Sequence, residues 1–201
     1  MDAREADESD RRTESNLMTS SPQAEVTIVD YDPAWPARFE EERTALRRAL
    51  TAWLAGPIEH IGSTAVPGLA AKPVIDIMAA VDTLEGSRDA ITAAAPLGYC
   101  YFPYQASVRH WMCKPSDAFR THHLHLVPTT SLQWVRPIAF RDYLRAHDDV
   151  AAEYLQLKRE LALKFRFDRE AYTEAKASFI EAVTQKAMTL GYGSGVRSAD
   201  S

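Results

Sequence analysis

The sequence of 201 residues predicts an α+β fold, in which helices pack on a mixed, mostly antiparallel sheet of four to five strands. Three observations support this prediction. Short apolar runs bounded by glycine and proline occur through the first two thirds of the chain, two of these runs are separated by one short loop, and the last third has apolar residues at helical spacing. A composition with 46% apolar and 25% charged residues suits one packed core.

Both ends of the chain are expected to lie outside this core. Residues 1–22 carry six acidic residues against three arginines and no periodic apolar pattern, so we expect a disordered acidic tail. Residues 23–190 form the predicted domain, and residues 191–201 are expected to be a flexible tail. The chain has neither a run of about 18 apolar residues nor an apolar segment behind a basic start, and we therefore expect a cytoplasmic protein with no membrane partner.

The first strand and the first helix are predicted before residue 58. Residues 25–31, EVTIVDY, alternate apolar and polar side chains and are rich in β-branched residues, which predicts a strand. Asp32 and Pro33 form a cap and first-turn pair that predicts the start of a helix, and Gly56-Pro57 is expected to end it. The apolar stripe of this helix consists of Trp35, Phe39, Leu46, Leu50 and Leu54.

The middle of the chain predicts the centre of the sheet. Residues 58–62, IEHIG, read as a short strand, residues 63–73 as a loop, and residues 74–81, VIDIMAAV, as a buried central strand. A short helix is predicted over residues 87–95, because Pro96 and Gly98 follow it.

An antiparallel hairpin and three helices are predicted for the rest of the domain. Residues 108–115 and 122–128 are strand-like runs joined by a short polar loop. FRDYLRAH, residues 140–147, predicts a short helix, Asp148 opens a second helix, and Asp168 caps a third. The apolar positions are Val150, Tyr154, Leu157, Leu161 and Phe165 in the second helix and Tyr172, Phe179 and Val183 in the third.

Charge and cysteine content narrow the classes of partner. The net charge of −5 falls to about −2 without residues 1–22, and lysine and arginine form no stripe, so no long nucleic acid partner is expected. The sequence is still compatible with a small anionic ligand that is held by a few residues. Cys100 and Cys113 lack metal-ligand spacing, and we expect them to be reduced packing residues.

Asp76 is a carboxylate within the apolar run VIDIM. A buried carboxylate without a partner costs several kcal/mol, and a divalent cation is one of the few partners that offset this cost. The bend at Gly62-Ser63 could let the backbone approach a phosphate. A Walker A loop is excluded because five residues separate Gly62 from Gly68, and the dinucleotide fingerprint is excluded because no second glycine stands two residues after Gly62.

A glycine-serine pair after a strand, followed by a strand aspartate, resembles the signature of the DNA polymerase beta type nucleotidyltransferases. The motif HIGSTAVPGLAAKPVIDI, with YDPAWPARFEEE before it and HLHLV, FRDYLRAH, EYLQLKRELA and AYTEAKASFIEAV after it, resembles the nucleotidyltransferase-like GrpB family from about Val26 to Met188. This resemblance implies that Gly62, Ser63 and Thr64 bind a nucleoside triphosphate and that Asp76 holds Mg²⁺. Members of this family also occur fused to dephospho-CoA kinase, which hints at nucleotide-related chemistry.

The sequence departs from the superfamily pattern at the second acid, which usually stands two residues after the first. Met78 occupies this position, and the neighbouring strand offers His123 and His125 where a third carboxylate is expected. The paired-carboxylate site for two metals is therefore incomplete. Either one metal suffices, or histidines complete the site, or nucleotidyl transfer is not the reaction.

Further candidates surround Asp76. His60, Asp76 and His125 could converge on a metal if their strands are neighbours, a set that suits a transition metal or zinc better than Mg²⁺. His125 could also be a general base, or the histidines could only bond to the backbone. Lys72 could reach a phosphate or be solvated.

The other basic residues are weaker candidates. Arg109, Arg120 and Arg141 are considered for phosphate binding, and of these Arg141 is included in the predicted substrate site. Lys158 and Lys176 fit the polar faces expected of amphipathic helices, unless the helices line the cleft.

The leading hypothesis is a metal-dependent nucleotidyltransferase that moves a nucleotidyl group from a nucleoside triphosphate to a small acceptor. In it, Gly62 and Ser63 hold phosphates, Asp76 holds the metal, and His125 orients or deprotonates the acceptor. Two alternatives remain. One is a catalytically inactive nucleotide- or ligand-binding accessory module on the same fold, and the other is a metal enzyme of another reaction type that uses His60, Asp76 and His125.

Overall fold

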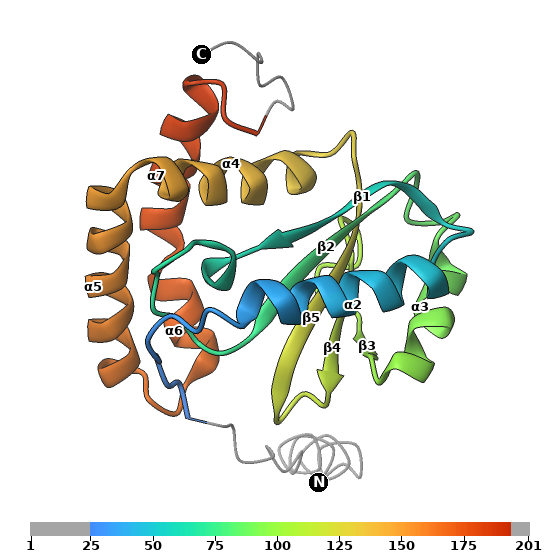
Figure 1. Cartoon of the computed structure of the whole chain (residues 1–201), viewed down its shortest axis with the longest axis horizontal. Helices are drawn as coiled ribbons and strands as arrows, with labels where there is room; N and C mark the ends of the chain where they lie inside the picture. The colour runs from blue at the N-terminus through green and yellow to red at the C-terminus, as the bar shows by residue number, and fades with distance from the viewer. Residues whose placement is uncertain (1–24, 194–201) are drawn as a thin grey trace, which may run out of the picture.

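A computed structural model of the chain describes residues 25–193 and shows one sheet with helices packed around it (Figure 1). In chain order the elements are α2 (Trp35–Ala49), β1 (Leu54–Ile61), β2 (Ile75–Val81), α3 (Arg88–Ala94), β3 (Cys100–Phe102), β4 (His110–Pro115), β5 (Arg120–Pro128), α4 (Leu132–Ala146), α5 (Asp148–Lys164), α6 (Arg169–Ala175) and α7 (Ala177–Thr189). Short 3-10 turns at Ser63–Ala65 and Ala95–Leu97 follow β1 and α3. The predicted acidic tail, residues 1–22, lies outside the described residues, as does most of the predicted C-terminal tail.

The sheet has the strand order β1-β2-β5-β4-β3. Strands β2 and β5 are parallel, and the other three neighbouring pairs are antiparallel. The prediction of an α+β fold with a mixed, mostly antiparallel sheet is confirmed, with five strands and six α-helices in the described residues. The expected hairpin is β4 and β5, and the strands that carry His60, Asp76 and His125 lie side by side as predicted.

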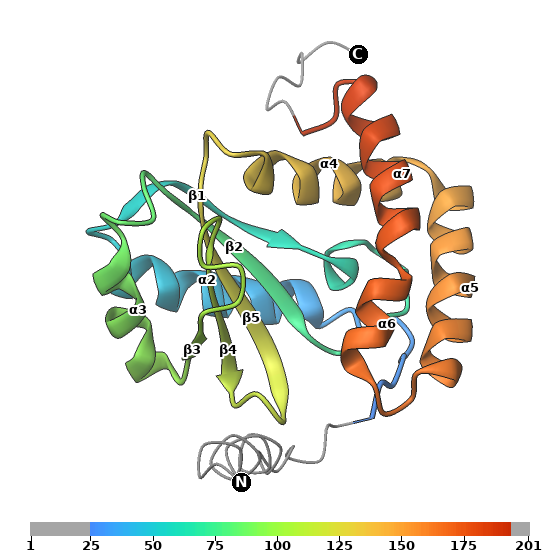
Figure 2. The same ribbon diagram turned by 180° about the vertical axis from the view of Figure 1, so that it is seen from behind.

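Side chains of β2 alternate between two covered faces of the sheet. Ile77 and Ala79 point to the main core beneath α2 and α3. Met78 and Ala80 point to the opposite face, where they pack with Trp134 of α4. Seen from behind, helices α5, α6 and α7 stand together at one end of the sheet (Figure 2). The second face is therefore the one on which a cleft can form between sheet and helices.

The predicted first strand is wrong. Residues 25–31 form no strand, and Val29 makes only an isolated bridge to Ala71. The alternation of this segment instead reflects burial of Val26 and Ile28 against α5 and α6, where the Val26 amide donates to the carbonyl of Arg166. The fifth strand is β3, a three-residue edge strand that its short length concealed.

The boundary between α2 and β1 also differs from the prediction. The helix ends at Ala49, so Leu54 is not part of its stripe but begins β1. Gly56-Pro57 lies inside β1, where the pairing with β2 shifts register between Leu54 and Ile58. A proline, which has no amide hydrogen, is tolerated in a strand at such an irregularity.

The C-terminal helices are longer or more divided than predicted. Helix α4 begins at Leu132 and contains Pro137, so the predicted segment 140–147 is only its second half. The third predicted helix is two helices, α6 and α7, that meet at Lys176. The cap at Asp168 is as predicted, because its carboxylate accepts a hydrogen bond from the Ala171 amide.

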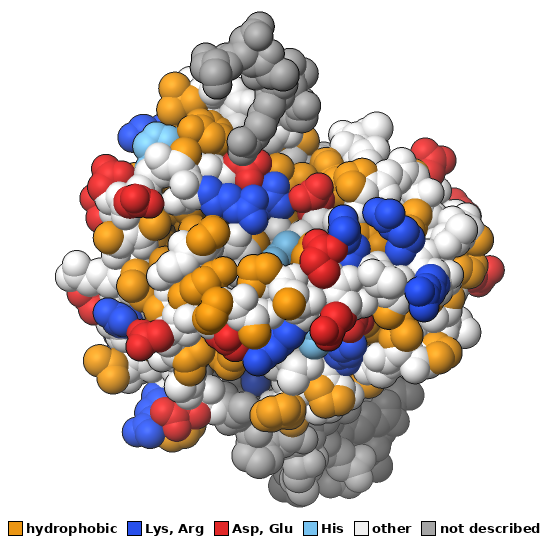
Figure 3. All heavy atoms as spheres, in the orientation of Figure 1, with side chains coloured by type: hydrophobic (Ala, Val, Ile, Leu, Met, Phe, Trp, Pro, Cys, Tyr) orange, Lys and Arg blue, Asp and Glu red, His pale blue; other side chains and the backbone are white. Residues whose placement is uncertain are grey.

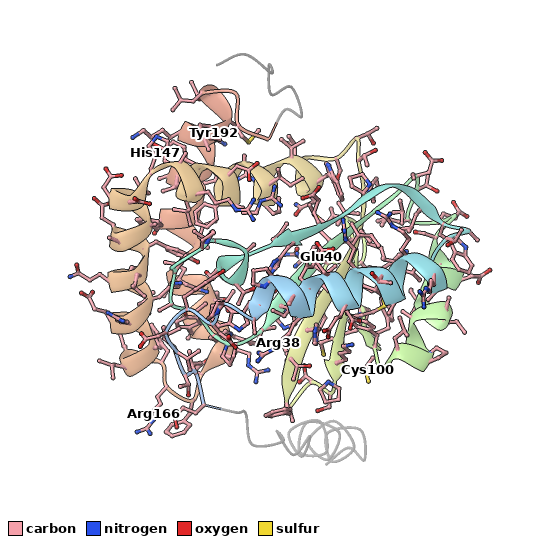
Figure 4. The ribbon with its side chains drawn as sticks, in the orientation of Figure 1. Arg38, Glu40, Cys100, His147, Arg166 and Tyr192 are labelled. Carbon is pink, nitrogen blue, oxygen red and sulfur yellow. The ribbon has the colours of Figure 1, made fainter. Side chains whose placement is uncertain are left out.

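Charged side chains of both signs lie on the surface (Figure 3), and the last described residues pack near the end of α4. On the face shown in Figure 3, basic and acidic side chains are interspersed. Tyr192 packs on Tyr143 and His147, and Figure 4 shows Tyr192 and His147 together near the end of α4.

Cys100 and Cys113 are opposite each other in β3 and β4, and both are free thiols. No helix in residues 25–193 is long and apolar enough to cross a bilayer.

We predict that Leu46→Ala lowers the free energy of unfolding by about 2–5 kcal/mol, because it opens a cavity in the main core. Leu46 is 0% exposed and packs between α2 and the sheet. Leu163→Ala is the control: this leucine is 83% exposed, and its loss should change stability by about 0.5 kcal/mol or less. Urea denaturation measures both, and equal effects would contradict the assigned core.

Candidate functional site

Gly62 brings the chain directly over Asp76. This glycine follows β1 with φ of 72° and ψ of −172°, a backbone conformation that residues with a Cβ rarely adopt. A Cβ at this position would lie 2.4 Å from Asp76 Oδ2 and 3.0 Å from its Cγ. Glycine is thus required twice, for its conformation and for the close approach. The bend and the acid, predicted to belong to one site, are in contact.

Three side chains on one face of the sheet form a candidate metal centre. The parallel register of β2 and β5 places His123 beside Asp76 and His125 beside Met78, so all four residues share a face. One ligand atom from each of Asp76, His123 and His125 lies within 4.8 Å of the others. The Asp76 side chain is 29% exposed, although the rest of β2 is almost fully buried.

His123 bridges the acid and the pocket. Its Nδ1 lies 2.7 Å from Asp76 Oδ1, which makes Nδ1 the donor, and its Nε2 is buried and has no hydrogen-bond partner among the described residues. An unpartnered buried nitrogen is costly. A ligand or a cation bound at His123 Nε2 would therefore supply the missing partner.

The charges around Asp76 favour its ionised form. Burial by itself would raise the pKa of the Asp76 carboxyl, but the hydrogen bond from His123 and the positive charge of Lys72 contribute to a net lowering. Burial lowers the pKa of His125 to about 3, and the neighbouring Arg109 adds to this shift. Arg109 Nη1 donates toward His125 Nδ1 at 3.3 Å. At neutral pH the centre thus holds a carboxylate beside a neutral His125.

A pocket of about 410 Å³ opens beside this centre. It is lined by the start of β2, by β5, by the loop after β1 and by residues of α4 to α7. Its polar lining residues include Ser63, Thr64, Lys72, Asp76, His123, His125, Gln133, Arg136, Lys158, Thr173, Lys176 and Thr184. This volume is in the range of sites for small molecules.

Three lysines of the pocket have lowered pKa values. Burial lowers the pKa of Lys72 to about 8, although Asp76 opposes the shift. Burial and the charge of Lys72 lower the pKa of Lys176 to about 8. Burial and the charge of Lys176 lower the pKa of Lys158 to about 7. The common cause is burial, because the ammonium groups lose water here and form no ion pair within residues 25–193.

Most of the predicted site residues line the pocket. Gly62, Ser63, Thr64, Lys72, Asp76 and His125 all contribute to its surface. Thr64 also has a structural role, because its hydroxyl donates to the carbonyl of Val74 at 3.1 Å.

His60 is not part of this group. It pairs with Ile77 and therefore points to the opposite face of the sheet from Asp76. There its ring stacks on Phe39 at 4.7 Å, and its Nε2 lies 3.0 Å from the Thr64 hydroxyl. Burial lowers the pKa of His60 to about 4. The expectation that His60 ligates a metal with Asp76 is corrected: His60 fixes the turn from beneath.

Arg141 does not line the pocket either. Its guanidinium donates to Glu59 at 2.7 Å, to Asp142 at 2.8 Å and to the carbonyl of His60 at 2.8 Å. Arg141 therefore ties α4 to β1 and does not face a phosphate in the pocket, contrary to the predicted substrate-binding role.

Met78 fills the position at which a second acid was considered. It is 1% exposed and packs with Ile61, Val127 and Trp134. An acidic side chain here would be buried among apolar groups, so the face has one carboxylate where a two-metal site needs a pair.

The predicted site omitted His123, Lys158 and Lys176. His123 shares its strand face with His125, but only the parallel register with β2 places it against Asp76. Lys158 and Lys176 each follow a buried tyrosine by four residues, Tyr154 and Tyr172. That spacing puts both lysines on the inward side of their helices and was a usable signal.

A family model described as GrpB protein matches residues 25–186. The chain belongs to the GrpB family. The resemblance inferred from the sequence motifs is thereby confirmed.

Relatives and a solved structure agree with this assignment. A UPF0157 protein of Pseudomonas aeruginosa is 37% identical over 167 residues, which cover 81% of this chain and 68% of that protein. The glutamate-rich protein GrpB of Alkalihalophilus pseudofirmus is 32% identical over 167 residues, covering 79% of this chain and 94% of that protein. The crystal structure of the conserved protein GrpB from Enterococcus faecalis superposes with a TM-score of 0.75 at 35% identity, covering 82% of this chain and 98% of that one.

A longer relative is named dephospho-CoA kinase, from Mycolicibacterium paratuberculosis. It is 29% identical over 181 residues, which cover 76% of this chain but only 44% of that protein. The GrpB-like region is thus less than half of that longer polypeptide.

We predict that Gly62→Ala costs about 3 kcal/mol of the free energy of unfolding, because the new methyl group would collide with Asp76. Gly68→Ala is a matched control. Gly68 has φ of 76°, but a Cβ there meets nothing within 4 Å, so only backbone strain of about 1 kcal/mol is expected. Urea denaturation measures both variants, and equal losses would show that the contact with Asp76 is unimportant.

We predict a pH-dependent difference in stability between the wild type and Lys176→Met. With a folded pKa of about 8, Lys176 releases its proton in the folded state at a lower pH than in the unfolded chain. The unfolded state therefore binds more protons between about pH 8 and pH 10.5, and wild-type stability rises with pH in that window. Relative to the variant, the wild type should gain about 2 kcal/mol from pH 7 to pH 10, as measured by urea denaturation at each pH. A constant difference would contradict the lowered pKa.

Proposed function

We propose that this GrpB protein is a metal-dependent transferase that moves a nucleotidyl group from a nucleoside triphosphate to a small acceptor. The observation that supports it most is the group of Asp76, His123 and His125 at the edge of a lysine-lined pocket, with Gly62 in contact with the acid. Phosphoryl chemistry needs positioning and charge neutralisation more than a protein nucleophile, and this site offers both.

The donor set fits a divalent transition metal better than Mg²⁺. One carboxylate and two imidazoles are ligands typical of zinc, manganese or iron, whereas Mg²⁺ prefers oxygen. The unpartnered Nε2 of His123 supports this fit. Asp76, His123 and His125 would hold the cation, which when bound would neutralise phosphate charge and polarise a P–O bond. We therefore replace the expected Mg²⁺ by a transition metal.

The chain's own residues then take separate roles. Gly62 lets the backbone lie against the Asp76 carboxylate, because a Cβ there would be 2.4 Å from Oδ2. Ser63 lies beside Tyr154, and both line the pocket. Lys72 provides positive charge on the side of Asp76 that faces the pocket. His125 suits ligation better than proton transfer, because a base with a pKa of about 3 is too weak at neutral pH.

The name of one relative is consistent with this class of chemistry. A dephospho-CoA kinase is by its name a phosphoryl-transfer enzyme, and this chain matches less than half of it. We propose no long nucleic acid as substrate, since the acidic chain shows no basic stripe on the face in Figure 3.

A second candidate is a binding module that has lost catalysis. The buried Met78 favours it, because the face carries a single carboxylate where a two-metal enzyme has a pair. The two candidates share ligand binding and differ in turnover.

We predict that His123→Asn weakens binding of Mn²⁺ or Zn²⁺ at least tenfold, because it removes one of three ligands. His122→Asn is the matched control, since His122 is adjacent in β5 but pairs with Ile75 and points to the other face. Isothermal titration calorimetry with each metal gives the affinities. Equal binding by both variants would contradict the assigned metal centre.

The same metal-loaded protein tests turnover. Pyrophosphate release from each nucleoside triphosphate, measured with a panel of small hydroxyl and amine acceptors, should occur in the wild type and fall at least a hundredfold in Asp76→Asn. Tight metal binding without pyrophosphate release from any pair would support the binding module.

A further inference from the structure

Three lysines from separate segments meet in the pocket. Lys72 precedes β2, Lys158 lies on α5, and Lys176 joins α6 to α7. Lys158 is only 2% exposed, and its ammonium group donates to the carbonyl of Ala70 at 2.5 Å. Side chains so far apart in sequence become neighbours only through the packing of α5 and α6 against the loop after β1.

The ammonium groups are ordered along the pocket. Lys72 and Lys176 both lie over the ring of Tyr172, at 5.3 Å and 4.1 Å from its centroid. Lys158 lies over the ring of Tyr154 at 4.8 Å. Lys176 acts electrostatically on Lys158, and Lys72 acts on Lys176. Lys176 thus interacts with both of the other lysines, and Asp76 acts on Lys72 and Lys176; we refer to Lys72, Lys176 and Lys158 as the lysine row.

This row has an excess of positive charge. Asp76 is the only carboxylate among the described residues that line the pocket. Within residues 25–193 no carboxylate forms an ion pair with Lys72, Lys158 or Lys176, whereas the fourth cation of the pocket, Arg136, is paired with Glu181. Ammonium groups that lose water without forming an ion pair are destabilising, and the lowered pKa values of all three lysines reflect this. A chain of net charge −5 thus gathers basic groups where they weaken the fold.

We propose that Lys72, Lys158 and Lys176 form a binding site for a linear polyphosphate, and that one end of the bound polyphosphate lies beside Asp76. A row of three cations matches an anion with several charges in a line, such as the triphosphate of a nucleotide or inorganic tripolyphosphate. A single carboxylate or sulfate would satisfy one or two of the lysines and leave the others unpaired.

This site deepens the proposed function, and its link to nucleotidyl transfer rests on that function. Binding of the polyphosphate itself requires no metal and no acceptor. The two proposals can therefore fail separately.

The test is isothermal titration calorimetry with sodium tripolyphosphate and the full-length protein in the presence of EDTA. Lys176→Met should weaken binding about ten- to hundredfold, since it removes the central charge-assisted contact. Lys186→Met and Lys164→Met are matched controls, because they remove the same charge from exposed positions of α7 and α5 and should change affinity less than twofold. Equal effects of Lys176→Met and Lys186→Met would overturn the proposal.

A folding check separates binding from structure. The ammonium group of Lys176 makes no hydrogen bond within residues 25–193, so Lys176→Met should keep or raise the thermal midpoint while it weakens binding. Lys158→Met also removes the hydrogen bond to Ala70 and serves as a second variant. If Lys176→Met lowers the thermal midpoint as well as the affinity for tripolyphosphate, Lys176 has a structural role and the proposed site is refuted.

Asp76→Asn distinguishes this site from the metal centre. It removes the one carboxylate of the described pocket lining, so tripolyphosphate should bind several-fold more tightly while metal binding is lost. Lys176→Met should show the reverse pattern, with metal binding retained. Loss of both ligands in both variants would contradict two adjacent sites.

A comparison of ligands identifies the source of the polyphosphate. Affinity should rise from orthophosphate through pyrophosphate to tripolyphosphate, because each added phosphate reaches another lysine. ATP binding at least tenfold more tightly than tripolyphosphate assigns the site to a nucleotide, and equal binding assigns it to the free polyanion. Equal affinity for orthophosphate and tripolyphosphate would overturn the row as a polyphosphate site.

Discussion

The contact between Asp76 and the Gly62 bend is the constraint on which the site depends. Asp76 is a carboxylate in β2, an interior strand of the sheet, and its cost is limited by the hydrogen bond from His123 and by the open pocket beside it. Gly62 lets the backbone approach the carboxylate closely because it has no side chain. The turn is held from the opposite face by His60, through Thr64. One strand register and one glycine therefore decide where a ligand can meet the acid.

The two faces of the sheet have different tasks. The face beneath α2 is closed by apolar packing, and even its histidine, His60, serves this packing by stacking on Phe39. The other face is covered by α4 on one side of Asp76, and the helices beyond α4 stand away far enough to leave the pocket. Apolar packing thus forms the core, whereas the polar groups of the site line the pocket between the sheet and the helices. The same division explains why Met78, two residues from Asp76, belongs to the core.

Positive charge in the pocket weakens the fold and suits the binding of anions. Lys158 and Lys176 lose water without gaining an acidic partner among the described residues, which lowers their pKa values. Sites that bind charged ligands commonly retain such unfavourable groups, because the ligand supplies the missing partner. The metal centre shows the same feature on a smaller scale, since His123 Nε2 lacks a partner.

The sequence by itself determined the α+β class, the buried strand with Asp76, the bend at Gly62 and the family, because these depend on local periodicity and on ordered motifs, although the strand predicted to be central is second in the sheet. It could not place residues 25–31, whose alternation reflected burial against α5 and α6 and not strand pairing. Only the tertiary structure decided which histidines join Asp76, since the parallel register of β2 and β5 selects His123 and the face of β1 excludes His60. It also decided that Arg141 is a tie to β1 and that a pocket opens beside Lys158 and Lys176, whose spacing from buried tyrosines indicates only that they point inward. Contacts between segments far apart in the chain depend on register and helix packing, and neither is encoded in local spacing.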